Sequence, residues 1–412
     1  MAPFLSIFLL GVFSLATAVN FTPVYESNEL ECDWPSEEIK TKALQENAFN
    51  PWPLSSAVYE SRLFLSLSDN EIVPLTLVSI PTNSVSTAHP KLTPFPSWDM
   101  HSDGSRDCNK IQFARGLEVD AIGRLWVLDE GTSSCNAKLW IFNLEKNDTL
   151  ELVHQFSSPY FFHDLVLDET PDGYFAYISR YFRKHIVVFS LKKNQSWIVE
   201  TPDTLWTAIA LSPKKGPARQ VYLAKQNDNE LHTISTALLR NETETAIPIS
   251  IGTWTAEPYR MLMDNLGTIY TAFESKNYTS SLNTSQPFQE QPLHGFADLD
   301  FTWPFTVALD QNGTLWMTVY NQKVNPKYRL LKAPVGVKSY IFEASPVCSE
   351  TCNLEHGVCL EVDDCRCKVG WKGDNCDVCH PYPGCVNGTC DQPWECNCLP
   401  GFRGKLCNLK NE

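Results

Sequence analysis

Short apolar runs, each followed by a turn and a second apolar run, recur along the first 330 residues. The six segments with this pattern are SSAVYESRLFLSLS from residue 55, GLEVDAIGRLWVLDEG from 116, DLVLDETPDGYFAYISR from 164, AIALSPKKGPARQVYLAK from 208, MLMDNLGTIYTAFE from 261 and VALDQNGTLWMTVYN from 307. Five of the six turns contain a glycine, which favours a tight reversal of the chain. The pattern predicts six β-hairpins.

The hairpins are evenly spaced along the chain. Asp120, Asp168, Ser212, Asp264 and Asp310 occupy equivalent positions in their turns and follow one another at intervals of 44 to 52 residues. A repeat of this length accommodates four short strands, the arrangement of a propeller blade. The sequence therefore predicts an all-β fold, a six-bladed β-propeller whose blades each use the hairpin as their two inner strands. Helical patterning is confined to SEEIKTKALQENAF, which begins at residue 36.

Cysteine is concentrated at the C-terminal end, where 12 of the 15 cysteines follow residue 347. They form two sets of six, and the sets end in the similar phrases CKVGWKGDNC and CLPGFRGKLC. A segment of about 30 residues cannot build a sufficient hydrophobic core, so disulfides must hold it together. Spacing alone leaves 15 possible connectivities for six cysteines. The predicted organisation is a signal peptide at 1–18, the propeller at 19–346 and two small disulfide-rich modules at 347–377 and 378–408.

The two cysteine-rich segments resemble EGF-like modules. The usual pairing in that family is first with third, second with fourth and fifth with sixth cysteine. The resemblance implies the disulfides Cys348–Cys359, Cys352–Cys365, Cys367–Cys376, Cys379–Cys390, Cys385–Cys396 and Cys398–Cys407. The acidic cluster that precedes the first cysteine of calcium-binding EGF modules is absent from SPVC and DNCDVC, so no calcium is expected there.

The three remaining cysteines are Cys32, Cys108 and Cys135. Cys108 and Cys135 flank the second hairpin and form the expected disulfide. Cys32 is then a free thiol, a partner in a bond between chains, or a buried thiol, and we favour the buried thiol.

The N-terminus has the pattern of a secretory signal. MAPFLSIFLLGVFSLATA is apolar and ends in small residues, which predicts cleavage after Ala18, with a buried N-terminal strand as the alternative. No other apolar run approaches the roughly 20 residues of a membrane helix, so no membrane insertion is expected. Eight N-x-S/T sequons accompany this signal, at Asn20, Asn147, Asn194, Asn241, Asn277, Asn283, Asn312 and Asn387. Together these features predict a secreted, extracellular glycoprotein.

Net charge narrows the range of partners. The formal charge of −15 disfavours nucleic acid, whose phosphates would be repelled, and mildly favours cationic ligands. The same net negative charge also favours solubility.

Several phrases resemble the yellow and major royal jelly protein family of arthropods. They are KLTPFPSW at 91–98, DCNK at 107–110, GRLWVLDEG at 123–131, IALSP at 209–213 and STALLRN at 235–241, and the resemblance extends over roughly residues 32 to 345. The chain departs from the family at Ile122, where a cysteine is usual, and in its paired EGF-like tail. The resemblance implies a six-bladed propeller but not one function, because members include amine-binding proteins, proteins that convert dopachrome and nutritive secretions.

The starts of the inner strands predict the mouth of the central channel. The residues expected there are Arg115, Gly116, His163, Asp164, Thr207, Ala208, Tyr259, Arg260, Phe305 and Thr306. Calcium-dependent propeller hydrolases need several convergent carboxylate or amide oxygens, and this set offers one carboxylate. The sequence therefore predicts neither a metal ion nor another cofactor.

The predicted ligand is a small aromatic molecule or amine. Phe305 and Tyr259 offer ring surfaces, and the side-chain oxygens of Thr306 and Asn321 can accept hydrogen bonds from an ammonium group. Antiparallel pairing places Thr306 and Asn321 at the same end of the last hairpin. The resemblance implies that these two residues hold the amine and that Phe95 adds an aromatic contact. Lys323 occupies the position where the amine-binding members have a stacking aromatic residue.

Two other functions are compatible with the sequence. Dopachrome conversion is a proton shift, and His163, Asp164, Arg115 and Arg260 are the candidates for its base and cation. Because neighbouring side chains on a strand point to opposite faces, only one of His163 and Asp164 is expected to face the channel. In the other reading the EGF-like pair binds an extracellular protein partner. We favour ligand binding over catalysis.

Overall fold

The structure, a computed structural model, describes residues 19–45, 50–68, 75–83, 91–101, 107–157, 161–202, 204–214, 219–242, 245–274, 276–296, 299, 305–342, 352–353, 355–361 and 364–411. The predicted signal peptide and Cys348 lie outside these residues. Within the described part of the chain, no helix is long and apolar enough to span a bilayer.

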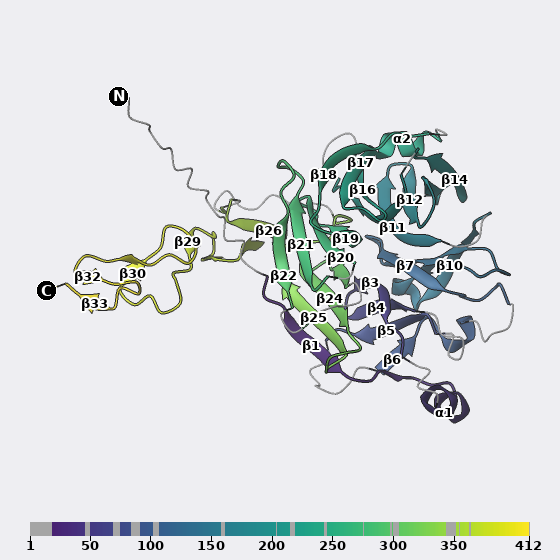
Figure 1. Cartoon of the computed structure of the whole chain (residues 1–412), viewed down its shortest axis with the longest axis horizontal. Coiled ribbons are helices and arrows are strands. Elements are labelled where there is room, and N and C mark those ends of the chain that lie inside the picture. The colour runs from purple at the N-terminus through teal and green to yellow at the C-terminus, as the bar shows by residue number, and fades with distance from the viewer. Residues whose placement is uncertain are drawn as a thin grey trace, which may run out of the picture.

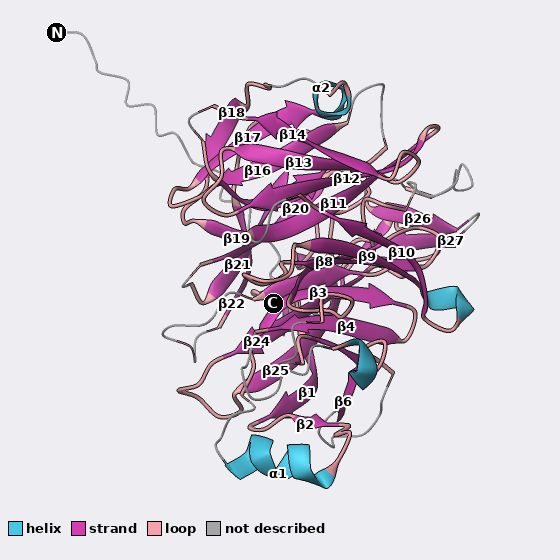
Figure 2. Cartoon of the chain, turned by 90° about the vertical axis from the view of Figure 1, so that its right-hand side faces the viewer, coloured by secondary structure: helices cyan, strands magenta, loops and turns pink. Residues whose placement is uncertain are grey.

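The described strands of residues 22–334 form six sheets arranged as the blades of a propeller (Figures 1 and 2). Blade 1 contains β3 (Pro53–Tyr59), β4 (Arg62–Leu67), β5 (Leu77–Pro81) and β6 (Lys91–Pro94), and blade 2 contains β7 (Ala114–Val119), β8 (Arg124–Asp129), β9 (Lys138–Asn143) and β10 (Thr149–Gln155). Blade 3 contains β11 (Phe162–Thr170), β12 (Gly173–Arg180), β13 (His185–Ser190) and β14 (Gln195–Glu200), and blade 4 contains β15 (Trp206–Leu211), β16 (Gln220–Lys225), β17 (Glu230–Ser235) and β18 (Ile249–Thr253). Blade 5 contains β19 (Pro258–Met263), β20 (Thr268–Phe273), β21 (Tyr278–Asn283) and β22 (Gln291–Gly295), and blade 6 contains β23 (Thr306–Leu309), β24 (Thr314–Tyr320) and β25 (Tyr328–Pro334).

The ring is closed by a strand from the N-terminal end of the chain. β1 (Thr22–Ser27) pairs antiparallel with β25 and becomes the outer strand of blade 6. β2 (Glu31–Cys32) adds a parallel fifth strand to blade 1 beside β6. The first and last described strands of the propeller, β1 and β25, thus share one sheet, and the segment from β1 to β2 connects the last blade to the first.

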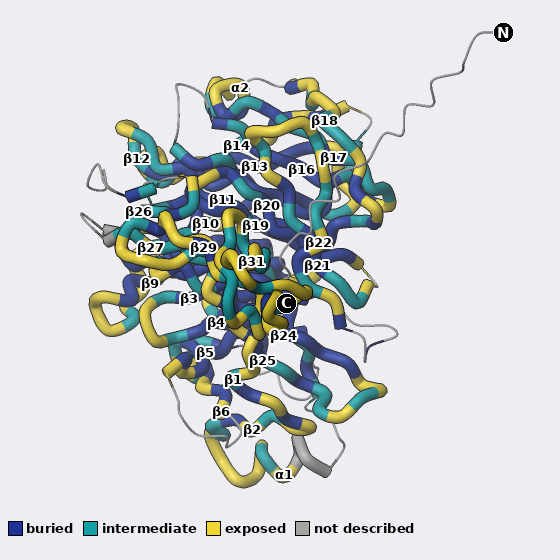
Figure 3. Tube along the Cα trace, turned by 90° about the vertical axis from the view of Figure 1, so that its left-hand side faces the viewer, coloured by how far each residue is buried: buried dark blue, intermediate teal, exposed yellow. Residues whose placement is uncertain are grey.

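All six predicted hairpins are confirmed as the two inner strands of their blades. The predicted helical segment is confirmed as α1 (Glu37–Gln45), whereas the short α2 (Thr236–Arg240), between β17 and β18, was not predicted. Two 3-10 turns, at Trp98–Met100 and Leu144–Lys146, complete the propeller. The inner and middle strands are buried almost throughout, as the tube coloured by burial shows (Figure 3).

A carboxylate at the turns of blades 2, 5 and 6 explains why these hairpins resemble one another in sequence. Asp310 Oδ1 accepts the backbone N–H groups of Asn312 and Thr314 at 2.8 and 2.9 Å, and its Oδ2 accepts the indole N–H of Trp316 at 2.9 Å. Equivalent bonds join Asp120 to Trp126 and Asp264 to Tyr270. The aspartate therefore satisfies two turn amides and fixes an aromatic ring six residues later, which is why the D-x-x-G-x-x-(W/Y) phrase is repeated.

The C-terminal region consists of short two-stranded sheets held by disulfides. The strands are β26 (Gly357–Glu361), β27 (Asp364–Cys367), β28 (Trp371–Lys372), β29 (Val378–Cys379), β30 (Gly388–Thr389), β31 (Asn397–Cys398), β32 (Phe402–Arg403) and β33 (Leu409–Lys410). The disulfides are Cys352–Cys365, Cys367–Cys376, Cys379–Cys390, Cys385–Cys396 and Cys398–Cys407, the pairs that the EGF resemblance implies. The sixth expected pair involves Cys348 and falls outside the described residues.

The cysteines of the propeller also occupy the expected states. Cys108 and Cys135 form a disulfide between the segment before β7 and the one after β8. Cys32 is a buried free thiol in the apolar cluster of blades 1 and 6, and burial raises its pKa to about 12. A thiol that stays protonated at neutral pH is a poor nucleophile, so Cys32 acts as a small apolar side chain.

The turn carboxylates are expected to carry much of the stability of their blades. Asp310→Ala leaves two amides and one buried indole N–H without their acceptor, so we expect the free energy of unfolding to fall by about 3 kcal/mol. Urea unfolding followed by tryptophan fluorescence measures this loss. Asp172→Ala is the matched control, because this exposed turn aspartate makes only a surface ion pair with Lys192 and its loss should cost less than about 0.5 kcal/mol. Equal losses in the two variants would contradict the role given to Asp310.

Candidate functional site

β-bulges reshape the starts of five inner strands among those described. The pairing register shifts between Pro53 and Ser55 in β3, Ala114 and Leu117 in β7, Phe162 and Asp164 in β11, Trp206 and Ile209 in β15, and Pro258 and Arg260 in β19. A bulge adds an unpaired residue and redirects the side chains around it. The bulged residues include Arg115, His163, Thr207 and Tyr259, which the sequence had placed at the mouth.

Of His163 and Asp164, Asp164 lines the channel cavity formed by the described residues, while both side chains contact blade 5. The His163 ring contacts the Tyr259 ring at a centroid distance of 5.0 Å, although the two residues belong to blades 3 and 5. Asp164 also reaches blade 5, where its Oδ2 lies 2.8 Å from Nη1 of Arg260. Strand alternation is interrupted by the bulge at His163, which is consistent with both neighbouring side chains contacting blade 5.

The mouth layer consists of Arg115, His163, Tyr181 and Tyr259. The His163 ring lies 4.4 Å from that of Tyr181, and the Arg115 guanidinium lies 5.6 Å from the centre of the same tyrosine ring. Burial, reinforced by Arg260 and Arg115, holds the pKa of His163 well below its usual range. The imidazole is therefore neutral at physiological pH, and its Nδ1 is buried without a hydrogen-bond partner.

An ion pair lies one residue deeper in the channel. Arg260 donates to Asp164 and also to the Ser55 hydroxyl, which in turn accepts the Leu117 N–H at 3.2 Å. Burial raises the pKa of Asp164 to about 6, although the Arg260 guanidinium opposes the shift. At neutral pH the pair is ionised and its charges cancel.

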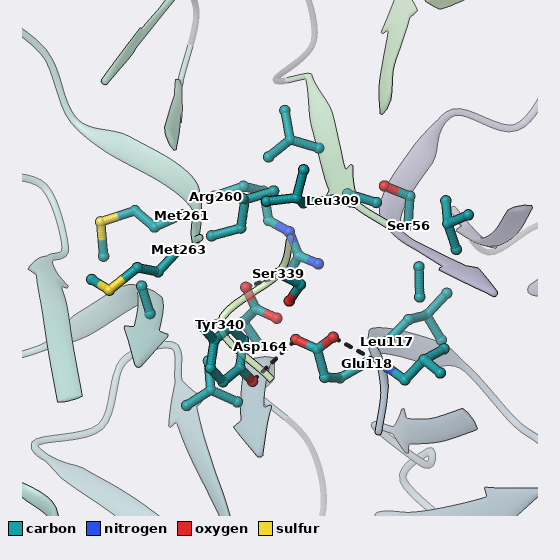
Figure 4. A pocket seen from close by; sticks show the side chains of 18 of the residues that line it. Ser56, Leu117, Glu118, Asp164, Arg260, Met261, Met263, Leu309, Ser339 and Tyr340 are labelled. Atoms are coloured by element: carbon teal, nitrogen blue, oxygen red, sulfur yellow. Dashed lines mark hydrogen bonds and ion pairs between the residues drawn. The ribbon is translucent and has the colours of Figure 1, made fainter. Parts of the chain in front are cut away.

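Glu118 is a second carboxyl group in the channel, and within the described part of the chain it forms no ion pair, although Arg260 acts on it electrostatically. Its Oε1 accepts the Val119 N–H at 3.2 Å and its Oε2 accepts the Tyr340 hydroxyl at 3.3 Å. Figure 4 shows that the carboxyl groups of Glu118 and Asp164 point into the same space. Burial, with a contribution from the charge of Asp164, raises the pKa of Glu118 to about 8. At pH 7 this side chain is mostly a neutral acid.

These groups line a narrow cavity of about 50 Å³, enough for a few water molecules. Besides Glu118, Asp164 and Arg260, its wall contains the polar residues Ser56, Ser339 and Tyr340 and many apolar side chains, among them Met261 and Met263. The segment 339–342 closes the side nearest the hairpin turns. There the Tyr340 hydroxyl accepts the Leu167 N–H at 2.8 Å, and the Tyr340 N–H donates to the Met263 carbonyl. The cavity thus lies between the aromatic mouth and this C-terminal segment.

The other predicted ligand residues lie elsewhere. The Thr306 hydroxyl bonds to that of Thr318 at 2.6 Å, and the Asn321 side chain accepts the Lys323 N–H at 2.8 Å. Phe305 packs on Phe296, and Phe95 lies between Phe64 and Phe142 in the core of blades 1 and 2. Thr306, Asn321, Phe305 and Phe95 are absent from the cavity wall formed by the described residues, so their contact with a ligand stays a prediction.

Glu118 and Tyr340 were missed by sequence reasoning. The residues two places before the five equivalent turn positions are Glu118, Val166, Ala210, Leu262 and Ala308, and all five line the cavity. Glu118 is the one polar member of this set, and comparing the hairpins at that position would have revealed it. Tyr340 follows the last strand of the propeller, and no repeat or spacing marks it.

The channel offers little support for a metal ion. Asp164 is neutralised by Arg260, which leaves Glu118 as the carboxyl group free of an ion pair in the cavity. Hard cations require several convergent oxygens. The one group of candidate ligands in the described part of the chain, Cys385, Cys396 and Cys407, consists of cysteines in disulfides.

Comparison with known proteins agrees with this architecture. The family model described as "Major royal jelly protein" matches residues 114–207, which hold blades 2 and 3, and the model "Delta-like/Jagged, EGF-like domain" matches residues 386–410. "Protein yellow" of Drosophila guanche is 26% identical over 369 residues that cover 76% of this chain. Over these ranges the chain is similar to the yellow and major royal jelly protein family. The chain spans 64% of the length of that relative, so the activity of the whole relative is not transferred to it.

Other relatives and solved structures are similar over comparable ranges. "Protein yellow" of Drosophila melanogaster is 25% identical over 345 residues, covering 71% of this chain and 63% of the relative. A luciferin-regenerating enzyme matches with a TM-score of 0.48 at 10% identity, over 72% of this chain and 96% of the enzyme. A putative gluconolactonase matches with a TM-score of 0.46 at 12% identity, over 71% of this chain and 91% of that protein.

The raised pKa of Glu118 predicts an unusual dependence of stability on pH. Its value in the native state, about 8, lies above the ordinary value of 4.5, so the native state holds this proton more tightly than the unfolded chain does. The free energy of unfolding should therefore decrease between pH 5 and 8, by up to roughly 1.4 kcal/mol per pH unit. Urea unfolding at pH 5, 6.5 and 8 measures the slope. The neutral variant Glu118→Gln should show a flatter dependence, and parallel curves for the two proteins would refute the assignment.

Proposed function

We propose that this protein is a secreted glycoprotein that binds a small aromatic amine in the propeller channel, with Glu118 receiving the ammonium group. Secretion is supported by the disulfides of the C-terminal region, because disulfide bonds persist in oxidising compartments. The observation that carries the ligand assignment is the Glu118 carboxyl group, which lies in the cavity and forms no ion pair with the described residues, although the charge of Arg260 acts on it from a distance.

The charge balance of the channel favours a cationic ligand over an anionic one. Arg260 is committed to Asp164 at 2.8 Å, whereas Glu118 has only neutral hydrogen-bond donors. An incoming ammonium group would supply the missing charge and displace the proton from Glu118. A buried carboxylate that gains such a partner loses the cause of its raised pKa.

The apolar part of the wall suits an aromatic ring. Met261 and Met263 line the cavity, and methionine side chains have three rotatable bonds and make favourable contacts with rings. Enlarging a cavity of about 50 Å³ to accept a phenylethylamine requires these side chains to change rotamer. Tyr181, Tyr259 and His163 at the mouth provide further ring surfaces along the approach.

Coupled proton release gives the proposal a distinctive test. Because only the ionised form of Glu118 pairs with an ammonium group, affinity for tyramine, dopamine or serotonin should rise about tenfold per pH unit between pH 6 and 8. Isothermal titration in buffers of different ionisation enthalpy measures both affinity and the protons released. Glu118→Gln should weaken binding at pH 8 by at least tenfold and abolish the release.

Glu38→Gln is the matched control, because it makes the same acid-to-amide change on the exposed surface of α1. Its affinity and its proton release should equal those of the unmodified protein. Binding that is independent of pH, or that survives Glu118→Gln unchanged, would exclude Glu118 as the amine site.

A second candidate function is the proton shift of dopachrome conversion, which one observation favours. His163 is neutral and has an unpartnered Nδ1, and the guanidinium groups of Arg115 and Arg260 act on it electrostatically. A neutral imidazole beside fixed cations has the components of a general base with electrostatic stabilisation of a developing enolate.

Catalysis predicts that dopachrome absorbance decays faster with the protein than in buffer alone. His163→Ala should reduce this rate at least a hundredfold, the usual contribution of a general base. Phe182→Ala, an exposed change near the mouth, should leave the rate unaffected. A decay equal to the buffer blank would remove this candidate.

A further inference from the structure

The topology of the blades sorts the glycosylation sequons between the two faces of the propeller. Because the strands of each blade alternate in direction, the loops that join strands one to two and three to four lie on one face, and the loops that join strands two to three lie on the other. The first is called the turn face, since it holds the hairpin turns of the Asp120 type. The second is the mouth face, where the inner strands begin.

Five sequons lie on the turn face. Four occupy the junction between the third and fourth strands of blades 2 to 5, and one lies in the inner hairpin of blade 6; they are Asn147, Asn194, Asn241, Asn283 and Asn312. All five side chains are exposed. Asn20 is exposed too, at the outer rim before β1, where the neighbouring Val19 N–H donates to Leu293 of blade 5.

Asn277 is the sequon of the mouth face, and its side-chain amide nitrogen already donates hydrogen bonds within the protein. It precedes β21, the third strand of blade 5. Its Nδ2 donates to the carbonyl oxygens of Phe296 and Leu299, at 3.1 and 2.7 Å, and its own carbonyl accepts the Phe296 N–H. A glycan is attached through this nitrogen and replaces one of its two hydrogens, so a modified Asn277 would lose one of the two bonds.

We propose that N-linked glycans occupy the turn face of the propeller, at Asn147, Asn194, Asn241, Asn283 and Asn312, and that Asn277 carries none. The modification then surrounds one face and leaves the mouth of the channel uncovered. Glycans are bulky and hydrophilic, so they hinder macromolecules that approach the face that bears them. A partner or ligand of this protein is therefore received at the mouth face.

The proposal rests on passage through the secretory pathway but not on the identity of the ligand. The full chain is produced in a eukaryotic cell line that secretes it, and the sites are mapped by releasing glycans with peptide N-glycosidase in ¹⁸O water. Mass spectrometry of the peptides should show the ¹⁸O-labelled aspartate at the five turn-face positions and unmodified asparagine at 277.

Single variants provide an independent readout. Asn194→Gln should reduce the mass of the secreted protein by one glycan, whereas Asn277→Gln should leave the glycan mass unchanged. Thr279→Val removes the same sequon without altering the Asn277 side chain, and it serves if Asn277→Gln is not secreted. The proposal is overturned if Asn277 carries a glycan at the same occupancy as the turn-face sites. It is also overturned if most of the turn-face sites are unmodified. Since no amine is used, the outcome is independent of ligand binding.

Discussion

The site depends on one constraint. Two carboxyl groups and one guanidinium group share a channel that has room for only a few water molecules. Charges removed from water must be paired or neutralised. Arg260 can satisfy Asp164, and the 2.8 Å contact shows that it does. Glu118 then retains its proton, since its remaining partners are neutral donors. The chemistry of the channel follows from this excess of carboxyl groups over guanidinium groups.

Two structural features of the propeller hold these side chains in place. Bulges at the strand starts aim His163, Tyr259 and the residues after them across the channel, which regular strands could not do. The turn aspartates of blades 2, 5 and 6 fix the opposite end of their hairpins by accepting backbone amide groups and an aromatic N–H or O–H group.

Much of the fold was predictable because its determinants are local. The alternation of apolar residues, the turn glycines and the spacing of Asp120 to Asp310 specify hairpins and their number. The closure by β1 was not predictable, since pairing with β25 depends on contacts about 300 residues apart. The site was only partly predictable: the mouth residues followed from counting along the hairpins, but the bulge at His163 and the approach of Tyr340 to Glu118 arise from tertiary geometry.

The protonation state of Glu118 is the most direct test of this account. Infrared difference spectra between the protein and its Glu118→Gln variant isolate the carbonyl stretch of this one acid. The account predicts a protonated-carboxyl band at pH 7 that disappears on titration to pH 9 and on saturation with an aromatic amine at pH 7. A carboxylate signal already present at pH 7, or an acid band that persists in the amine complex, would contradict it.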